Sequence, residues 1–70
     1  MEEWPDGLYQ HFKGSYYIVM AVGKHTETGE LMVCYRNAAE EIYWIRPLSM
    51  WNEKVEHKGK IVPRFNRITA

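Results

Sequence analysis

The sequence has a single cysteine and no long apolar run. Its 70 residues contain one cysteine, Cys34, so no disulfide can form within the chain. Small secreted domains usually depend on disulfides, and their absence favours a reducing compartment, so we expect a cytoplasmic protein. No apolar run approaches the ~20 residues of a membrane-spanning helix, and the first residues lack a signal-peptide pattern. We therefore expect no membrane partner.

Net charge is also lacking, because nine lysines and arginines balance nine aspartates and glutamates. Proteins that coat nucleic acid or bind anionic membranes generally need a net basic field, so the composition argues against both functions. It stays compatible with a local basic site. No histidine or cysteine pair has the spacing of a metal site. We expect neither a metal nor another cofactor.

So short a chain forms one domain with a thin core, since it buries only about 60% of its unfolded surface. Ten aromatic side chains compensate in part. We expect an N-terminal arm over residues 1–6, with Trp4 packed on the domain, a single domain over 7–65, and a loose tail over 66–70. The first six residues are acidic and the last fourteen basic, which favours a weak attraction between the two ends.

The segment from Ser15 to Arg36 is the predicted scaffold. Two runs of β-forming residues, YYIVMAV and LMVCY, flank the polar segment KHTETGE. This pattern predicts a long antiparallel hairpin with its turn at Thr28 and Gly29. The first run is apolar on both faces, so we expect a sharp bend, with Gly23 as the bend or bulge. Cys34 lies in the second run and is interpreted as a buried small hydrophobic residue.

The rest of the chain predicts short strands and one helical turn. Pro47 ends a strand and suits the first helical position, so Pro47 to Asn52 is the expected turn, with Leu48 and Trp51 on its buried side. A turn is expected at Lys58-Gly59. The predicted strands are Leu8–Lys13, Ile42–Ile45, Lys54–Glu56 and Ile61–Phe65, in addition to the hairpin. Five to six strands with tight turns favour a mostly-β, small SH3-like antiparallel barrel, with an OB-like barrel as the alternative.

Six short motifs occur in a fixed order along the chain. They are HFKG at His11–Gly14, Tyr17, HTETGE at His25–Glu30, VCYR at Val33–Arg36, WIRPL at Trp44–Leu48 and PRF at Pro63–Phe65. In residue type and spacing the chain resembles the bacterial family called "domain of unknown function 1653" over about Gly7 to Phe65. Two departures are a threonine at Thr26, where the family usually has serine, and a loop, NAAEEIY, without the usual glycine-containing turn.

The resemblance implies an SH3-like barrel in a small bacterial cytoplasmic protein, and it implies no function. It marks the polar residues that belong to the shared motifs, which are His11, Lys13, His25, Glu27, Arg36, Arg46 and Arg64.

Three arginines suggest a site for an anion. Arg36, Arg46 and Arg64 each lie at or near a predicted strand end, and strand ends converge on the rim of a barrel. Guanidinium groups bind phosphate or carboxylate with two parallel hydrogen bonds, and an aromatic such as Trp44 can stack on a base, worth roughly 1–3 kcal/mol. The candidate ligand-binding residues are His11, Lys13, His25, Glu27, Arg36, Trp44, Arg46 and Arg64. The alternative is that the arginines pair with carboxylates and the aromatics form the core.

The sequence supports a non-enzymatic binding module as the first hypothesis, with an anionic ligand such as a nucleotide or an RNA phosphate. The alternative is a peptide- or protein-binding adaptor, because SH3-like barrels often present aromatic grooves to extended peptides. A hydrolase-like activity is the third hypothesis, since His25 and Glu27 would share a face on a regular strand. Their spacing is unspecific, so no catalytic residue is assigned.

Overall fold

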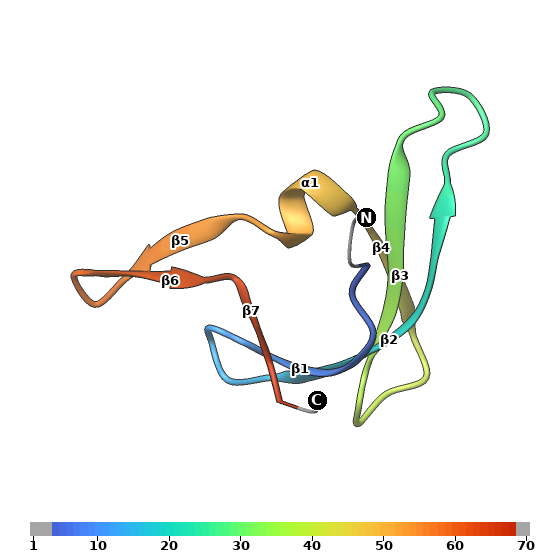
Figure 1. Ribbon diagram of the computed structural model, residues 1–70. Helices are drawn as coiled ribbons and strands as arrows, with labels where there is room; N and C mark the ends of the chain where they lie inside the picture. The colour runs from blue at the N-terminus through green and yellow to red at the C-terminus, as the bar shows by residue number, and fades with distance from the viewer. Residues whose placement is uncertain (1–3, 69–70) are drawn as a thin grey trace.

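The structure, a computed structural model, describes residues 4–68 (Figure 1). Along this part of the chain the elements are β1 (Gly7–His11), β2 (Tyr16–Lys24), β3 (Leu31–Asn37), β4 (Tyr43–Pro47), α1 (Leu48–Trp51), β5 (Lys54–His57), β6 (Lys60–Pro63) and β7 (Phe65–Arg67). Five strands form an antiparallel sheet in the order β4-β3-β2-β1-β7, and β5 and β6 form a separate hairpin.

The expected small, mostly-β antiparallel fold with one helical turn is confirmed. Two details differ from the prediction. The described residues form seven strands instead of five or six, and hydrogen bonding does not close the five-stranded sheet into a barrel. The segment predicted as one last strand, Ile61–Phe65, bends at Arg64 and becomes β6 and β7. Because β7 pairs with β1, Asn66 and Arg67 belong to the sheet, although they were expected in the tail.

The β2–β3 hairpin forms as predicted, with Gly29 at a φ of 74° in its turn. The bend of β2, however, lies at Met20 and not at Gly23, which pairs regularly with Met32. The register shifts between Val19 and Ala21, so Met20 is an extra residue in the strand. A bulge of this kind reverses the alternation of side chains. It therefore lets both Val19 and Val22 pack against the core and explains the apolar run.

Strand β4 extends to Pro47, which pairs with Met32, so this proline does not stop the strand where we expected. A proline is tolerated here because β4 lies at the edge of the sheet, where no second neighbour needs its amide. The helical turn begins directly after it. At the other hairpin, Lys58 and Gly59 both have positive φ angles of 52° and 77°, the geometry of a type I′ turn.

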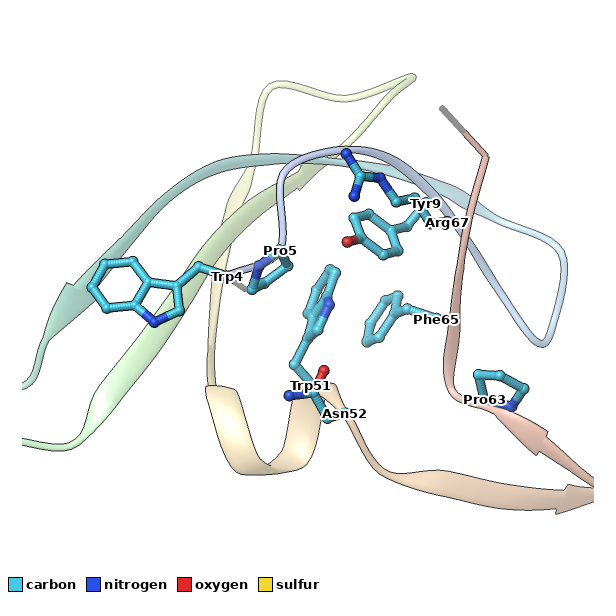
Figure 2. A pocket seen from close by; sticks show the side chains of 8 residues that line it. All are labelled: Trp4, Pro5, Tyr9, Trp51, Asn52, Pro63, Phe65 and Arg67. Atoms are coloured by element: carbon cyan, nitrogen blue, oxygen red, sulfur yellow. The ribbon is translucent and has the colours of Figure 1, made fainter. Parts of the chain in front are cut away.

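The core is a cluster of aromatic rings on the concave side of the sheet. Trp51 of α1 stacks on Phe65 of β7, with ring centroids 3.8 Å apart and planes 7° apart. Tyr9 and Tyr35 approach Trp51 edge-on at 5.2 and 4.9 Å. These four side chains and Val33 are the buried core, and Leu48 packs against it as predicted. Figure 2 shows Trp51, Tyr9 and Phe65 close together.

Trp4 and Cys34 are less buried than the sequence suggested, and Trp44 is not the core residue that one alternative expected. Trp44 is 50% exposed and Trp4 49% exposed, so neither is a core residue. Cys34 is only partly buried, because it lies on the convex face of β3, opposite in direction to Val33 and Tyr35. The two ends of the domain do meet: Arg67 donates to Asp6 at 2.6 Å in an exposed ion pair. No helix within residues 4–68 is long and apolar enough to cross a membrane.

The different burial of two tryptophans gives a direct test of this core. We expect Trp51→Ala to lower the free energy of unfolding by about 3–5 kcal/mol, because it removes the ring on which three others pack. Trp44→Ala should cost about 1 kcal/mol or less, since half of that side chain is already in water. Urea unfolding followed by circular dichroism measures both. Equal losses in the two variants would contradict this assignment of the core.

Candidate functional site

Two of the candidate residues project to the concave, core side of the sheet because of their register. His11 pairs with Phe65, and Arg46 pairs with Val33, and both of these partners are buried in the core. Directly paired residues of antiparallel strands point to the same face. Arg64 lies at the corner between β6 and β7, next to Phe65. We call His11, Arg46 and Arg64 the inner basic cluster.

His11 is a half-buried imidazole among aromatic rings, 5.1 Å from Phe65 and 6.2 Å from Tyr17 between ring centroids. Its Nδ1 accepts a hydrogen bond from the backbone amide of Lys13 at 3.1 Å. Burial lowers the pKa of His11 below its usual value, and the positive charges of Arg64, Arg46 and Lys13 lower it further. The ring is therefore neutral at pH 7, with its proton on Nε2.

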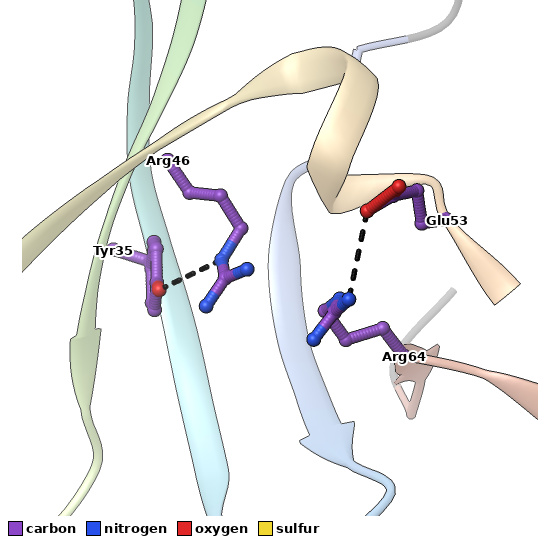
Figure 3. A network of polar contacts seen from close by, with 4 residues as sticks. All are labelled: Tyr35, Arg46, Glu53 and Arg64. Atoms are coloured by element: carbon purple, nitrogen blue, oxygen red, sulfur yellow. Dashed lines mark hydrogen bonds and ion pairs between the residues drawn. The ribbon is translucent and has the colours of Figure 1, made fainter. Parts of the chain in front are cut away.

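Arg46 is held by neutral groups only. Its Nε donates to the Tyr35 hydroxyl at 3.3 Å, and its guanidinium carbon lies 5.8 Å from the centre of the Phe65 ring. Figure 3 shows the hydrogen bond to Tyr35. Among residues 4–68, no carboxylate comes within ion-pair distance of Arg46. Its charge is thus uncompensated at short range.

Arg64 is fixed by its backbone and only partly compensated through its side chain. Its amide donates to the Glu53 carbonyl at 3.0 Å, and its carbonyl accepts from the Phe12 amide at 3.0 Å. One Nη lies 3.5 Å from a carboxylate oxygen of Glu53, which is half exposed (Figure 3). Its Nε is buried and has no hydrogen-bond partner. A buried guanidinium donor without an acceptor is costly.

Trp44 and Lys13 lie close to this cluster in the fold. Trp44 pairs with Tyr35 and so points to the same face as Arg46, two residues along the edge strand. Lys13 lies in the β1–β2 turn, where its charge acts on His11. Five of the eight candidates are therefore placed on or beside the concave side.

The other three candidates lie elsewhere. Arg36 is on the convex face of β3, where it donates to the Glu40 carbonyl at 3.2 Å. His25 and Glu27 lie in the β2–β3 turn, and Arg36 is five positions along β3 from Leu31 at that end. At ~3.3 Å per residue this is roughly 16 Å. The sequence expected one rim, and the structure does not bring these three residues to it.

His25 has a structural contact in its turn. Its Nδ1 accepts the backbone amides of Glu27 at 3.1 Å and Thr28 at 3.4 Å. The idea that His25 and Glu27 share a strand face is wrong, because both lie in the turn beyond β2. The geometric argument for a catalytic pair is therefore lost.

Two residues that hold the arginines in place were not among the candidates from the sequence. Tyr35 orients Arg46, and Glu53 pairs with Arg64. Tyr35 could have been found from the sequence, because it stands beside Arg36 in the VCYR motif and neighbouring residues of a strand point to opposite faces. Glu53 could not, since only the fold brings it to Arg64.

The surface near the cluster is hollowed in two places. One cavity of about 290 Å³ is lined by core residues Tyr9, Trp51 and Phe65 with Arg67 and Asn52 (Figure 2). Another, of about 350 Å³, lies between the β1–β2 turn and the β5–β6 hairpin, and His11 lines it. Both approach the ~300 Å³ that is usual for small ligands. In the described part of the chain no three histidine, cysteine or acidic side chains group together as a metal site would require.

Residues 7–67 match the family described as "Protein of unknown function (DUF1653)". The chain belongs to this family. A solved structure described as that of a protein belonging to DUF1653 from Bordetella bronchiseptica has a TM-score of 0.86 and 29% sequence identity to the chain. The similarity covers 94% of this chain and 88% of the Bordetella chain. No curated protein matches the chain. The family resemblance drawn from the motifs is thus confirmed, and it assigns no function.

The lowered pKa of His11 predicts how stability depends on pH. The unfolded chain binds a proton at His11 near pH 6.5, whereas the folded chain resists it. The contribution of His11 is therefore fully present above about pH 6.5 and is lost as the pH falls below that value. We expect the melting temperature to fall between pH 7 and 5, and His11→Gln to reduce that fall.

The matched control is His25→Gln, which changes an imidazole that accepts backbone amides in the same way but lies in an exposed turn. The fall in melting temperature of His11→Gln is compared with that of this variant over the same pH range. An unchanged pH profile in His11→Gln would show that His11 is not held neutral by the fold.

Proposed function

We propose that this domain is a small binding module without catalytic activity, whose ligand carries an anionic group such as the phosphate of a nucleotide or of RNA. The inner basic cluster would hold that group. The observation that carries the proposal is that Arg46 and Arg64 have few partners for their charges. They lie beside the core, and within the described residues only Arg64 of the two has a carboxylate in reach, that of half-exposed Glu53 at 3.5 Å.

Unused hydrogen-bond donors support this proposal. A guanidinium has five N–H donors, and among the described residues the Arg46 side chain donates to one neutral hydroxyl. Arg64 has a buried Nε without an acceptor. His11, with Nδ1 occupied, offers its Nε2–H. An anionic group such as phosphate has several acceptor oxygens for these donors, and charge-assisted hydrogen bonds are about twice as strong as neutral ones.

A binding role is favoured over a catalytic one because the groups of the cluster are donors. Nδ1 of His11 already accepts the Lys13 amide, and a neutral imidazole with its other nitrogen protonated cannot take a proton there. Trp44, on the same face and half exposed, adds a ring on which a base can stack. This favours a nucleotide or RNA over an isolated phosphate.

The alternative function is a peptide- or protein-binding adaptor. It is favoured by the exposed aromatic side chains Tyr16, Tyr43 and Trp44. It has less support from the fold than from the sequence, because five aromatic side chains that could line a groove pack together in the core. These are Tyr9, Tyr17, Tyr35, Trp51 and Phe65. Salt distinguishes the two functions, since affinity for a phosphate falls steeply with salt and affinity for an apolar peptide does not.

Thermal shift of the purified domain tests the anion site, with inorganic phosphate, nucleoside mono- and triphosphates and short RNA as probes at low and moderate salt. A ligand at 100 times its dissociation constant stabilises the fold by about 2.7 kcal/mol, or on the order of 10 °C for a domain of this size. We expect such a shift with a phosphate-bearing probe, smaller at higher salt and lost in Arg46→Ala.

Arg36→Ala is the matched control, because Arg36 lies one strand away from Arg46 but on the convex face. It should keep the full shift. The anion site is contradicted if no probe shifts the melting temperature, or if Arg36→Ala loses the shift as fully as Arg46→Ala.

A further inference from the structure

The edge strand β4 and the residue before it expose four consecutive large apolar side chains. Ile42, Tyr43, Trp44 and Ile45 are 54%, 57%, 50% and 67% exposed. Along residues 4–68, β4 pairs with β3 on one side and with no strand on the other. Tyr43 and Ile45 project from the convex face, whereas Trp44 projects from the concave face. Both faces of this edge are therefore apolar and open.

Such an edge is unusual for a small protein. Natural sheets protect their edges with lysine, proline, bulges or inward charges, because a flat apolar edge strand associates with other strands. Between Ile42 and Ile45 there is no charged residue. Arg46 points to the concave side and Pro47 stands only at the end of the strand. A run of exposed apolar residues in this setting points to a contact surface.

We infer that β4 pairs antiparallel with β4 of a second copy of this chain, around a two-fold axis. An occupant that covers both faces of an open edge must itself be a strand with apolar side chains on both faces and a free edge. β4 meets these requirements. A two-fold interface uses the same patch on both subunits, so one strand supplies both halves. The result is a continuous ten-stranded sheet.

The chemistry of β4 favours the register centred on Ile45. In that register Ile45 lies opposite Ile45 of the second copy on the convex face. Trp44 lies opposite Arg46 of the second copy on the concave face, twice over by symmetry. The guanidinium of Arg46 stays on Tyr35 and Phe65, and the aliphatic part of the same side chain lies opposite the indole ring.

The size of the surface predicts a weak dimer. A large aromatic side chain buries roughly 150–250 Å² in full, so the four half-exposed residues offer on the order of 400 Å² in each copy. With the strand backbones the total is about 1,000 Å², which is the lower limit for a specific interface. The chain has no net charge, so long-range repulsion does not oppose the contact. We expect a dissociation constant in the micromolar range.

Sedimentation equilibrium of the full chain, from about 1 µM to 1 mM, tests the dimer. The apparent mass should rise with concentration toward twice the monomer value, and Ile45→Lys should weaken association at least tenfold. Ile61→Lys is the matched control: Ile61 is also 67% exposed, but it lies on β6 of the other sheet. It should leave association unchanged, and thermal melts verify that both variants fold.

Cysteine cross-linking tests the register. Opposite residues of an antiparallel pair have Cβ atoms about 4.5–5.5 Å apart, near the distance that a disulfide requires. Ile45→Cys in a Cys34→Ala background should therefore form a disulfide-linked dimer under mild oxidation, and Ile61→Cys in the same background should not.

Three results would overturn the inference. One is a monomer at every concentration, including a monomer that captures an extended apolar peptide at β4 instead of a second copy. Another is equal weakening by Ile45→Lys and Ile61→Lys. The last is a concentration-dependent dimer in which Ile45→Cys cross-links no faster than Ile61→Cys.

Discussion

The stacking of Trp51 on Phe65 is the contact on which the rest of this domain depends. The sheet is not closed by hydrogen bonds, and the strands at its two ends, β4 and β7, do not pair with each other. The ring of Trp51 connects them instead, because α1 follows β4 directly and Phe65 begins β7. One helical turn thus does through side-chain packing what a further strand pair does in a closed barrel. The thin core that a 70-residue chain allows is consistent with this use of large, flat side chains.

The basic cluster follows from the same arrangement. Aliphatic side chains such as Val33 and Leu48 pack with the aromatic rings of the core, and part of its margin is formed by groups that contact a ring and still carry a charge or a polar hydrogen. Arg46 lies over Phe65 and His11 lies edge-on to it. Their positions are therefore set by the core, which satisfies one donor of the Arg46 guanidinium through the Tyr35 hydroxyl. If the proposed function holds, these side chains would lose little conformational freedom when they bind an anion.

Local patterns in the sequence predicted the strands, turns and helical turn, but they did not predict which face of the sheet each side chain lies on. The hairpin, the buried side of the helical turn with Leu48 and Trp51, and the Lys58-Gly59 turn all follow from residue types a few positions apart. The apolar run of β2 predicted a bend or bulge but not its position at Met20, because any residue of such a run can be the extra one. Arg36 and Arg46 look alike in the sequence, and only the register of β3 against β4 separates them. His25 and Glu27 were assigned to a rim because distance along a strand could not be judged before the strand ends were known.

The contact between Arg64 and Glu53 at the base of the β5–β6 hairpin connects the inner basic cluster to the hairpin. This hairpin is a separate two-stranded sheet, and its two ends are joined by the backbone hydrogen bond and the ion pair between Arg64 and Glu53. The same guanidinium belongs to the inner basic cluster. If an anion bound Arg64 in place of Glu53, the ion pair would be lost, whereas the backbone bond between the two residues and the contact of the His57 ring with Phe12 would remain. The mobility of the hairpin would then depend on whether an anion occupies the cluster. His57 and Val62, which line the cavity beside His11, belong to the hairpin and would move with it.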